Sequence, residues 1–395
     1  MTGEKPLKIV IAADTYPPDV NGAAVFCHRL ATAMSERGHE VHIMATRPDK
    51  GPTITEIRPE ATVHRLRSHA VPTHEYFRIC FPWEINPEIK ELLNTIQPDV
   101  VHAQCHYMIG QGALAFANKR GIRTVATNHF MPENLDPFLP FPQWFKRIVA
   151  RNSWRDMGKI MGKANVVTTP TPLAARAMSR YARLSTVLPL SNGIDSSHYE
   201  RGATEKIGRN PFPTILFVGR LAVEKNVNEI IDALALMKTV PDAHLEVIGG
   251  GEQREPLEKL ARESGLADRV RFLGHVDDEE LRTAYLRCDV FCQPGTAELQ
   301  SLVTLEALSA SKPVVLANAM ALPHLVDNGI NGYLFEPGDR NDLAEKLDAI
   351  LALGPEDRAL MGKAGHEKAS LHSHSKTMDT FEAIYRGAGA EDFLP

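Results

Sequence analysis

Residues 214–237 read Thr-Ile-Leu-Phe-Val-Gly-Arg-Leu-Ala-Val-Glu-Lys-Asn-Val-Asn-Glu-Ile-Ile-Asp-Ala-Leu-Ala-Leu-Met. The first five form a nearly unbroken apolar run, which is typical of a strand buried on both faces. A loop with Gly219, Arg220 and Lys225 follows, and apolar residues then recur at helical spacing over 227–237. A buried strand that leads through a loop into an amphipathic helix is the repeating unit of a parallel sheet. The stretch therefore predicts an α/β fold.

The same strand–helix unit recurs along the chain, which predicts two doubly wound α/β domains in series. Turn-forming residues, including Asn192-Gly193 and Asn210-Pro211, separate the two series between 189 and 213. In the first series we expect a helix over 24–37 and strands over 9–13, 41–45, 100–102, 124–128 and 166–169. In the second we expect strands over 214–219, 245–248, 270–272, 290–292 and 313–316, and helices over 227–237, 253–264, 278–287, 303–310, 340–353 and 366–386.

The composition is that of a globular protein. The 395 residues suffice for two domains, and 43% are apolar and 24% charged, which excludes fibrous and largely disordered chains. No run approaches the ~18 uncharged apolar residues of a membrane span, and the first residues do not resemble a secretory signal. The five cysteines, at 27, 80, 105, 288 and 292, lack the spacing of a zinc site and fit reduced thiols in a cytoplasm.

The net charge of −5 conceals an asymmetry. Residues 1–190 carry 23 Lys and Arg against 16 Asp and Glu, whereas 191–395 carry 21 against 33. The first half is therefore at +7 and the second at −12. Because +7 spread over 190 residues is weak evidence for nucleic-acid binding, we expect no nucleic-acid partner. No feature indicates an oligomeric state.

Ligands of doubly wound sheets bind at the carboxyl ends of the strands, so the loops there are candidate sites. The loop after the strand 9–13 leads to Gly22, at the start of a helix. Either the N–H groups of this helix start hold an anion, or Gly22 merely turns the chain. Arg220 and Lys225 lie in the loop after the strand 214–219. They either neutralise a bound diphosphate or are surface charges in contact with solvent. The glycines 249–251 admit a ligand or form a tight turn. The dinucleotide fingerprint Gly-x-Gly-x-x-Gly is absent.

The fourth loop carries two carboxylates, Glu298 and Glu306, eight positions apart. A helix that begins near Leu302 would direct both carboxylates, and the backbone N–H groups of 299–301, toward one ligand. Two glutamates around an apolar helix start are equally compatible with a capping arrangement.

Taken together, these loops resemble those of the retaining, nucleotide-sugar-dependent glycosyltransferases of family 4, which have the GT-B fold. The resemblance runs from Pro17-Pro18 to the end and rests on Gly219-Arg220 with Lys225, the glycines 249–251, Phe272-Leu-Gly-His275, the Glu298/Glu306 pair, Pro313-Val-Val315 and Asp327-Asn-Gly-Ile-Asn-Gly332. It implies two Rossmann-like domains facing a deep cleft. Residues 1–190 would form the acceptor-side domain, with a C-terminal helix, 371–395, packed on it, and residues 191–370 the donor-binding domain.

The resemblance also implies roles for individual residues. Arg220 and Lys225 would hold the donor diphosphate, and Glu298 and His129 would lie at the transferred hexose, so these four are the candidate catalytic residues. His129 is alternatively a packed histidine at a strand end, and packing is favoured for the weaker candidates His102 and His106. The remaining donor-binding candidates are Gly22, Gly250, His275, Val276, Leu299, Gln300, Ser301 and Glu306, the last on the ribose hydroxyls.

We expect neither a metal nor a cofactor besides the nucleotide-sugar donor. No Asp-x-Asp motif occurs, and Arg220, Lys225 and helix ends can supply the positive charge instead. The resemblance implies front-face displacement with retention, in which the leaving phosphate helps to deprotonate the acceptor. The base, uridine or guanosine, and the sugar, glucose, mannose or a uronic acid, stay open at this point. Three positions depart from the family: Ser311, where Gly is common, His324, where Glu is common, and Ala23, which replaces a second glycine.

The acceptor-side domain concentrates its positive charge in 141–163. Basic segments with aromatic residues suit an anionic membrane surface, and residues 128–142 resemble the acceptor loop of bacterial enzymes that glycosylate diacylglycerol-type lipids. We therefore expect a lipid acceptor at the cytoplasmic face of the membrane, with the protein bound peripherally. The alternatives are a helix with solvated charges and a soluble small-molecule or polysaccharide acceptor. The candidate residues are Trp144, Lys146, Arg147, Arg151 and Arg155, with apolar bulk from Phe145, Ile148 and Trp154.

Two other functional classes are compatible with the fold. A nucleotide-sugar epimerase would isomerise the donor without an acceptor, and the pair Glu298 and Glu306 argues against it. A nucleotide-sugar-binding protein without activity would not need the full set of charged residues, and Arg220, Lys225, Glu298 and Glu306 are all present.

Overall fold

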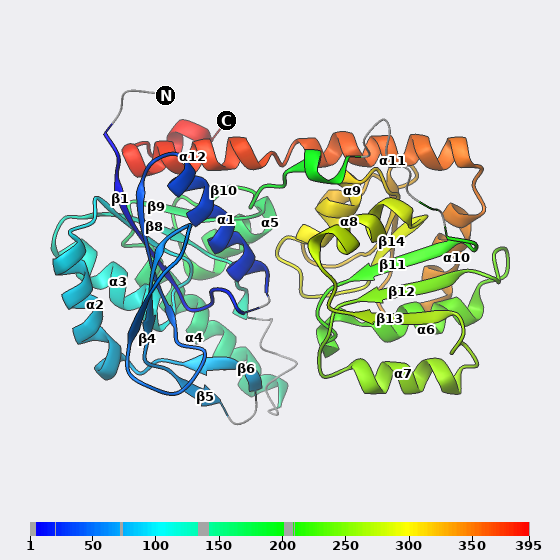
Figure 1. The fold of residues 1–395 in the computed structure, drawn as a ribbon, viewed down its shortest axis with the longest axis horizontal. Coiled ribbons are helices and arrows are strands. Elements are labelled where there is room, and N and C mark those ends of the chain that lie inside the picture. The colour runs from blue at the N-terminus through cyan, green and yellow to red at the C-terminus, as the bar shows by residue number, and fades with distance from the viewer. Residues whose placement is uncertain are drawn as a thin grey trace. The chain divides into compact units, whose positions relative to one another are not determined.

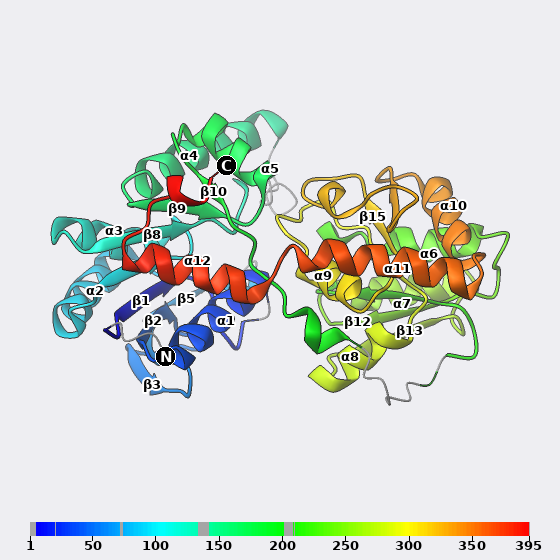
Figure 2. The same ribbon diagram turned by 90° about the horizontal axis from the view of Figure 1, so that it is seen from above.

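The computed structural model describes residues 5–19, 21–71, 74–132, 142–200, 208 and 210–394 (Figure 1). The chain folds as two compact units, residues 1–191 with 376–395, and residues 192–375. Each unit consists of a β-sheet with helices on its faces (Figure 2).

The first unit is built on an eight-stranded sheet of order β10-β9-β8-β7-β1-β2-β4-β3. Its pairings are parallel except that of β3 with β4, which the strand–helix pattern does not anticipate. The turn at 58–61 is too short for a parallel crossover, so these two strands form a hairpin. The strands are β1 (Lys8–Ala13), β2 (Glu40–Thr46), β3 (Ile54–Ile57), β4 (Thr62–Leu66), β7 (Val100–Ala103), β8 (Arg123–Thr127), β9 (Val166–Thr169) and β10 (Leu188–Pro189), beside a separate pair, β5 (His69–Val71) and β6 (His74–Ile79).

Alternation along β1 gives this sheet two buried faces. Ile9 and Ile11 belong to a core shared with α1 and α12, whereas Val10 and Ala12 pack with α2 and α3. The helices are α1 (Gly22–Glu36), α2 (Pro82–Ile96), α3 (Met108–Lys119), α4 (Gln143–Met161), α5 (Pro172–Ala177) and α12 (His374–Arg386), and a π-helical turn, η2 (Met178–Ala182), continues α5.

The end of the chain contributes α12 to the core of the first unit. Phe381 and Tyr385 are buried there. The guanidinium of Arg37, just after α1, donates to Glu382 at 2.8 Å and to Asp379 at 2.7 Å. Apolar packing and charge together therefore fix α12 against α1.

The helical run expected over 366–386 is interrupted. The second unit's last helix, α11, ends at Ser370, and α12 begins at His374. In between, the N–H of Ile194 donates to the carbonyl of His372 at 2.7 Å, and the N–H of His374 donates back to Ile194 at 3.0 Å. A helix cannot continue through backbone groups that pair with another segment, so the prediction of one helix is wrong at 371–373.

The second unit is a parallel sheet of order β13-β12-β11-β14-β15-β16. The strand order reverses between β11 and β14, and ligands of such sheets bind outside the carboxyl ends of the strands at this switch point. The strands are β11 (Thr214–Val218), β12 (His244–Ile248), β13 (Val270–Gly274), β14 (Val290–Gln293), β15 (Val314–Ala317) and β16 (Gly332–Phe335). The helices are α6 (Val227–Leu236), α7 (Arg254–Glu263), α8 (Asp278–Arg287), α9 (Leu302–Ser309), α10 (Arg340–Leu351) and α11 (Pro355–Ser370). The second unit also has the short 3-10 turns η3 (Ser196–Tyr199), η4 (Val223–Lys225) and η5 (Pro323–Leu325), whereas η6 (Glu391–Phe393) belongs to the first unit.

Candidate active site

The loops after β11 and β14 meet at the switch point of the second unit through charged side chains. The ammonium of Lys225 donates to Glu298, and the guanidinium of Arg220 donates to Glu224 at 2.5 Å. The N–H of Thr296 also donates to the carbonyl of Glu224, at 3.2 Å. The structure therefore joins the predicted diphosphate ligand Lys225 to Glu298, whereas Arg220, in the same loop as Lys225, pairs with Glu224.

Glu306 lies one helical turn inside α9 and is only 7% exposed. Its carboxylate accepts a hydrogen bond from the hydroxyl of Tyr285 at 3.0 Å. Burial, together with the neighbouring carboxylate, raises the pKa of Tyr285 well above its usual value. The phenol therefore stays protonated and orients Glu306, a role that no local signal around Tyr285 indicates.

Helix α9 begins at Leu302, one residue before the range 303–310 predicted for it. Its N-cap, Ser301, accepts from the N–H of Thr304 at 3.4 Å. Among the residues that the structure describes, no acceptor bonds the backbone N–H of Leu299 or Ser301. These donors and the first turn of α9 form a group that favours an anion. The side chain of Gln300, in contrast, accepts from the N–H of Asn192 at 2.9 Å.

Gly249 and Gly251 are required by packing against the backbone of the neighbouring loop 219–221. A Cβ on Gly249 would lie 2.0 Å from the carbonyl oxygen of Gly219, and its φ of +124° is one that other residues rarely adopt. A Cβ on Gly250 would lie 2.8 Å from Nε2 of His275. Packing thus accounts for Gly249 and Gly251, whereas the exposed His275 side chain could move away from a Cβ at Gly250, and a donor contact at Gly250 stays a prediction.

The residues predicted to border the base follow β13. His275 is exposed and Val276 is half-buried against the core. Because β13, β12 and β11 are neighbouring parallel strands, the loop after β13 lies at the same carboxyl edge of the sheet as Arg220.

Gly22 is the first residue of α1 in the first unit. A Cβ there would meet no atom of the described chain within 4 Å, and the side chain of the N-cap, Asn21, accepts from the N–H of Ala24 at 2.9 Å. Packing therefore gives no reason for glycine at this position, in contrast to Gly249.

His129 follows β8 and donates through Nε2 to Oε1 of Gln104 at 2.7 Å. Burial lowers the pKa of His129 to about 4, so its imidazole is neutral at pH 7. His102 is wholly buried and hydrogen-bonds Tyr385 and Thr127, both at 2.6 Å. His106 is also buried. Packing therefore explains His102 and His106. No local pattern in the sequence points to Gln104 as the partner of His129.

The basic segment forms α4, whose first half is unburied. Trp144 is 64% and Ile148 38% exposed, and Arg147, Arg151 and Arg155 are exposed as well, whereas Lys146 is half-buried. Trp154 is buried with its ring 5.6 Å from that of Tyr181, so it belongs to the core and not to the exposed apolar bulk predicted for it. Residues 133–141 of the predicted acceptor loop lie outside the described residues.

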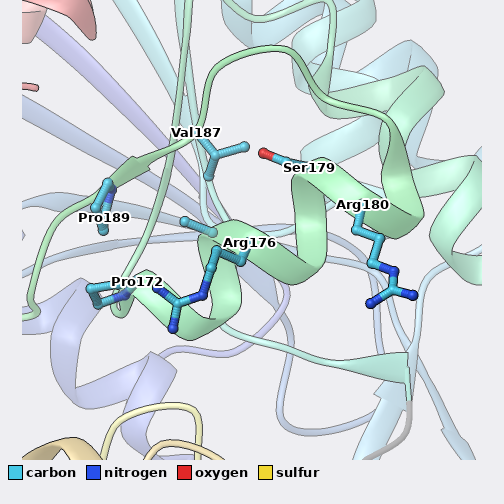
Figure 3. A pocket seen from close by; sticks show the side chains of 7 residues that line it. Pro172, Arg176, Ser179, Arg180, Val187 and Pro189 are labelled. Atoms are coloured by element: carbon cyan, nitrogen blue, oxygen red, sulfur yellow. The ribbon is translucent and has the colours of Figure 1, made fainter.

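A depression of about 550 Å³ lies on the first unit beside α5. Figure 3 shows Arg176, Ser179 and Arg180 on the helical wall, with Val187 and Pro189 on the following segment. The close ring contact of Tyr181 with Trp154 places this wall beside α4.

Two kinds of feature are absent from the described residues. None of the helices there is both long and apolar enough to cross a membrane. Nor do three or more His, Cys, Asp or Glu side chains gather there into a group that could hold a metal ion.

Comparison with protein families identifies the chain. A model described as Glycosyltransferase Family 4 matches residues 20–198, and one described as Glycosyl transferases group 1 matches 204–368. The chain belongs to glycosyltransferase family 4. It is accordingly a retaining hexosyltransferase that takes its sugar from a nucleotide-sugar donor.

Similar proteins carry names that refer to different transferred sugars and products. A sulfoquinovosyl transferase of Arabidopsis thaliana is 29% identical over 319 residues, which are 78% of this chain and 60% of that longer protein. An alpha-monoglucosyldiacylglycerol synthase of Acholeplasma laidlawii is 23% identical over 84% of this chain and 86% of its own. A glycogen synthase of Mycobacterium tuberculosis is 27% identical over 87% of this chain and 86% of its own.

Solved structures show the same architecture. Sucrose-phosphate synthase from Thermosynechococcus elongatus matches with a TM-score of 0.78 and 21% identity, over 97% of this chain and 98% of that one. An Anabaena protein in complex with UDP-glucose matches with a TM-score of 0.71 and 19% identity, over 95% of this chain and 100% of that one. The fold is therefore GT-B.

The two contrasting glycines give a test of the site. We expect Gly22→Ala to leave the urea unfolding midpoint unchanged or slightly raised, because the added methyl meets open space and Ala favours helix. If a ligand approaches Gly22, kcat/KM nevertheless falls. Gly249→Ala is the contrasting variant, expected to lose about 2 kcal/mol or more through its clash and positive φ. Full kcat/KM in Gly22→Ala would show that this glycine only starts the helix.

Proposed function

We propose that this enzyme transfers a glucose- or mannose-type hexose from a nucleoside diphosphate sugar to a lipid acceptor at an anionic membrane surface. The observation that carries the donor half is the ion pair between Lys225 and Glu298, which joins the loop of Arg220 and Lys225 to the loop that leads into α9 at the switch point of the second unit. The exposed basic and aromatic face of α4 carries the acceptor half.

The donor diphosphate would lie between the two cations and the first turn of α9. Arg220 and Lys225 neutralise the charge that develops on the leaving phosphate, and the N–H groups near Ser301 add hydrogen bonds. Because these groups belong to the protein, the transfer we propose needs no metal. Lys225 already donates to Glu298, so a hexose bound by Glu298 would sit directly beside the diphosphate.

The remaining roles follow from position in the second unit. Glu306, oriented by Tyr285, would accept hydrogen bonds from the ribose hydroxyls. His275 and Val276 would border the base. His129 and Gly22 of the first unit would approach the hexose and the phosphates. We propose front-face displacement, with the leaving phosphate taking the acceptor proton, and a trapped covalent glycosyl-enzyme adduct would contradict it.

The exposed part of α4 has the composition of a membrane-facing surface. Successive helical residues are rotated by about 100°, so Trp144, Arg147, Ile148, Arg151 and Arg155 fall within an arc of about 100°. An aromatic ring and an aliphatic side chain among three cations suit the headgroup region of anionic lipids. This arc is the proposed membrane face.

The basic face continues from α4 onto α5 and η2. Residues 142–191 contain nine Lys and Arg against one acid, Asp156. Tyr181 is 52% exposed, and the guanidinium of Arg180 lies 5.4 Å from the centre of its ring. Arg176 and Arg180 also line the depression in Figure 3. An aromatic ring with a neighbouring cation is common at membrane interfaces, where one end is apolar and the other wet.

The Acholeplasma relative is named a synthase of a glucosylated diacylglycerol, which supports a lipid acceptor for this chain. The Mycobacterium tuberculosis relative is named a glycogen synthase, which supports a polysaccharide acceptor as the second candidate. The exposed Trp144 and Ile148 favour the lipid, because apolar side chains on a solvated helix stabilise membrane binding.

The donor site is tested by removing its cations. We expect Arg220→Ala and Lys225→Ala each to lower kcat by on the order of 100-fold, since each removes charge stabilisation of the leaving diphosphate. Initial rates with UDP- and GDP-linked glucose and mannose measure this. Arg262→Ala, which removes an exposed arginine of α7, is the matched control and should keep the wild-type rate. Wild-type transfer by both site variants would refute the assignment.

The acceptor surface is tested with vesicles. At low salt the protein should co-sediment with phosphatidylglycerol vesicles and not with phosphatidylcholine vesicles. Replacing Arg147, Arg151 and Arg155 by Ser should weaken binding by on the order of 100-fold, at about 1 kcal/mol per cation. The matched control replaces Lys259, Arg262 and Lys363 of the second unit. If the wild-type protein ignores anionic vesicles, or if both triple variants weaken equally, the proposed face is wrong.

A further inference from the structure

Two sets of contacts connect His129 to the C-terminal helix α12, one of hydrogen bonds and one of aromatic rings. Gln104 and His129 come just after β7 and β8, which are neighbours in the sheet with Ala103 opposite Ala126. Residues that follow adjacent parallel strands meet at the same sheet edge, so Gln104 reaches His129 directly. The two side chains are linked by the 2.7 Å hydrogen bond from Nε2 of His129 to Oε1 of Gln104.

The polar support continues from Gln104 to α12. The amide nitrogen of Gln104 lies 3.4 and 3.3 Å from the two ring nitrogens of His102. His102 in turn hydrogen-bonds the hydroxyl of Tyr385 through Nδ1 and that of Thr127 through Nε2, both at 2.6 Å. Gln104, His102 and Tyr385 are all buried, so each of these contacts has little competition from water.

The apolar support ends on the same helix. The ring of Phe26, on α1, lies 4.9 Å from that of His129 and 5.7 Å from that of Phe381. Phe381 also lies 5.3 Å from the ring of His102. The polar contacts therefore end on Tyr385 and the apolar contacts on Phe381, both residues of α12. They reach His129 only through Gln104, His102 and Phe26.

The network determines which way the Gln104 amide points. Its nitrogen is nearly equidistant from the two ring nitrogens of His102, a position over the ring face. An N–H is attracted to an aromatic face and a carbonyl oxygen is repelled by it. The amide oxygen consequently faces His129, and because that oxygen only accepts, Nε2 of His129 must carry the proton.

We propose that Gln104 is a positioning residue that fixes His129 in its Nε2–H tautomer, with Nδ1 left as an acceptor, and that α12 sets this arrangement through Tyr385 and Phe381. Nδ1 makes no hydrogen bond with any described residue, so it is available to a ligand hydroxyl. The consequence for catalysis rests on the proposed function, which places His129 at the transferred hexose. The tautomer itself does not depend on that function.

Nitrogen-15 NMR of histidine-labelled full-length protein tests the tautomer, with the His129 signal assigned by its loss in His129→Asn. Wild-type protein should show one Nε2–H form. Gln104→Leu should show a mixture of tautomers, and Gln104→Glu should raise the pKa of His129, because a carboxylate beside Nε2 favours the charged ring. Tyr385→Phe should shift the His102 and His129 signals together. Gln111→Leu, on an exposed position of α3, and Tyr333→Phe are the matched controls.

The rates give the second readout. Gln104→Leu should lower kcat by on the order of 10- to 100-fold with donor KM nearly unchanged, because it misplaces a group without removing donor contacts. In Gln104→Glu the pH profile of kcat should follow the raised pKa of His129, which a purely structural defect would not produce. A single Nε2–H tautomer in folded Gln104→Leu overturns the proposal. If His129→Asn transfers sugar at the wild-type rate while the tautomer responds to Gln104, the catalytic use of His129 fails and the tautomer assignment stands.

Discussion

The ion pair between Lys225 and Glu298 connects the two loops on which the proposed donor site depends. One loop follows β11 and the other β14, the adjacent strands at which the strand order of the second unit reverses. The sheet brings the loops near each other, and the pair fixes their side chains. Gly295 keeps room for the contact, because a Cβ there would lie 3.3 Å from Glu298 Oε1 and 3.5 Å from Lys225 Cδ. The start of α9 and the position of Glu306 then follow along the same stretch of chain.

Local geometry, not net charge, decides what this site can bind. Residues 191–395 carry 21 basic against 33 acidic side chains, yet the proposed donor is an anion. Charges that are exposed and more than about 10 Å apart are largely screened, so the cations beside the site outweigh distant carboxylates. Arg220 and Lys225 each already have a carboxylate partner, in Glu224 and Glu298. A bound diphosphate would share these cations with the two carboxylates, which limits how tightly it is held and favours its release after transfer.

The sequence predicted the features that depend on local pattern. Apolar runs located β11, β12, β14 and β15, and the helix predicted over 303–310 is α9, which begins one residue earlier, at Leu302. Contacts between distant segments had no such signal. The pairing of Ile194 with 372–374 divides the last two helices, Trp154 is taken into the core by Tyr181, and Tyr285 and Gln104 become partners of Glu306 and His129. Each depends on tertiary packing that spacing along one element does not encode.

The most direct test is a crystal structure of the enzyme with UDP or GDP bound. The account predicts that the diphosphate lies within hydrogen-bonding distance of Arg220, Lys225 and the backbone N–H groups at the start of α9, with Glu306 on the ribose. A nucleotide bound away from the carboxyl ends of β11 and β14 would contradict it. So would a diphosphate at that edge that leaves both cations paired only with Glu224 and Glu298.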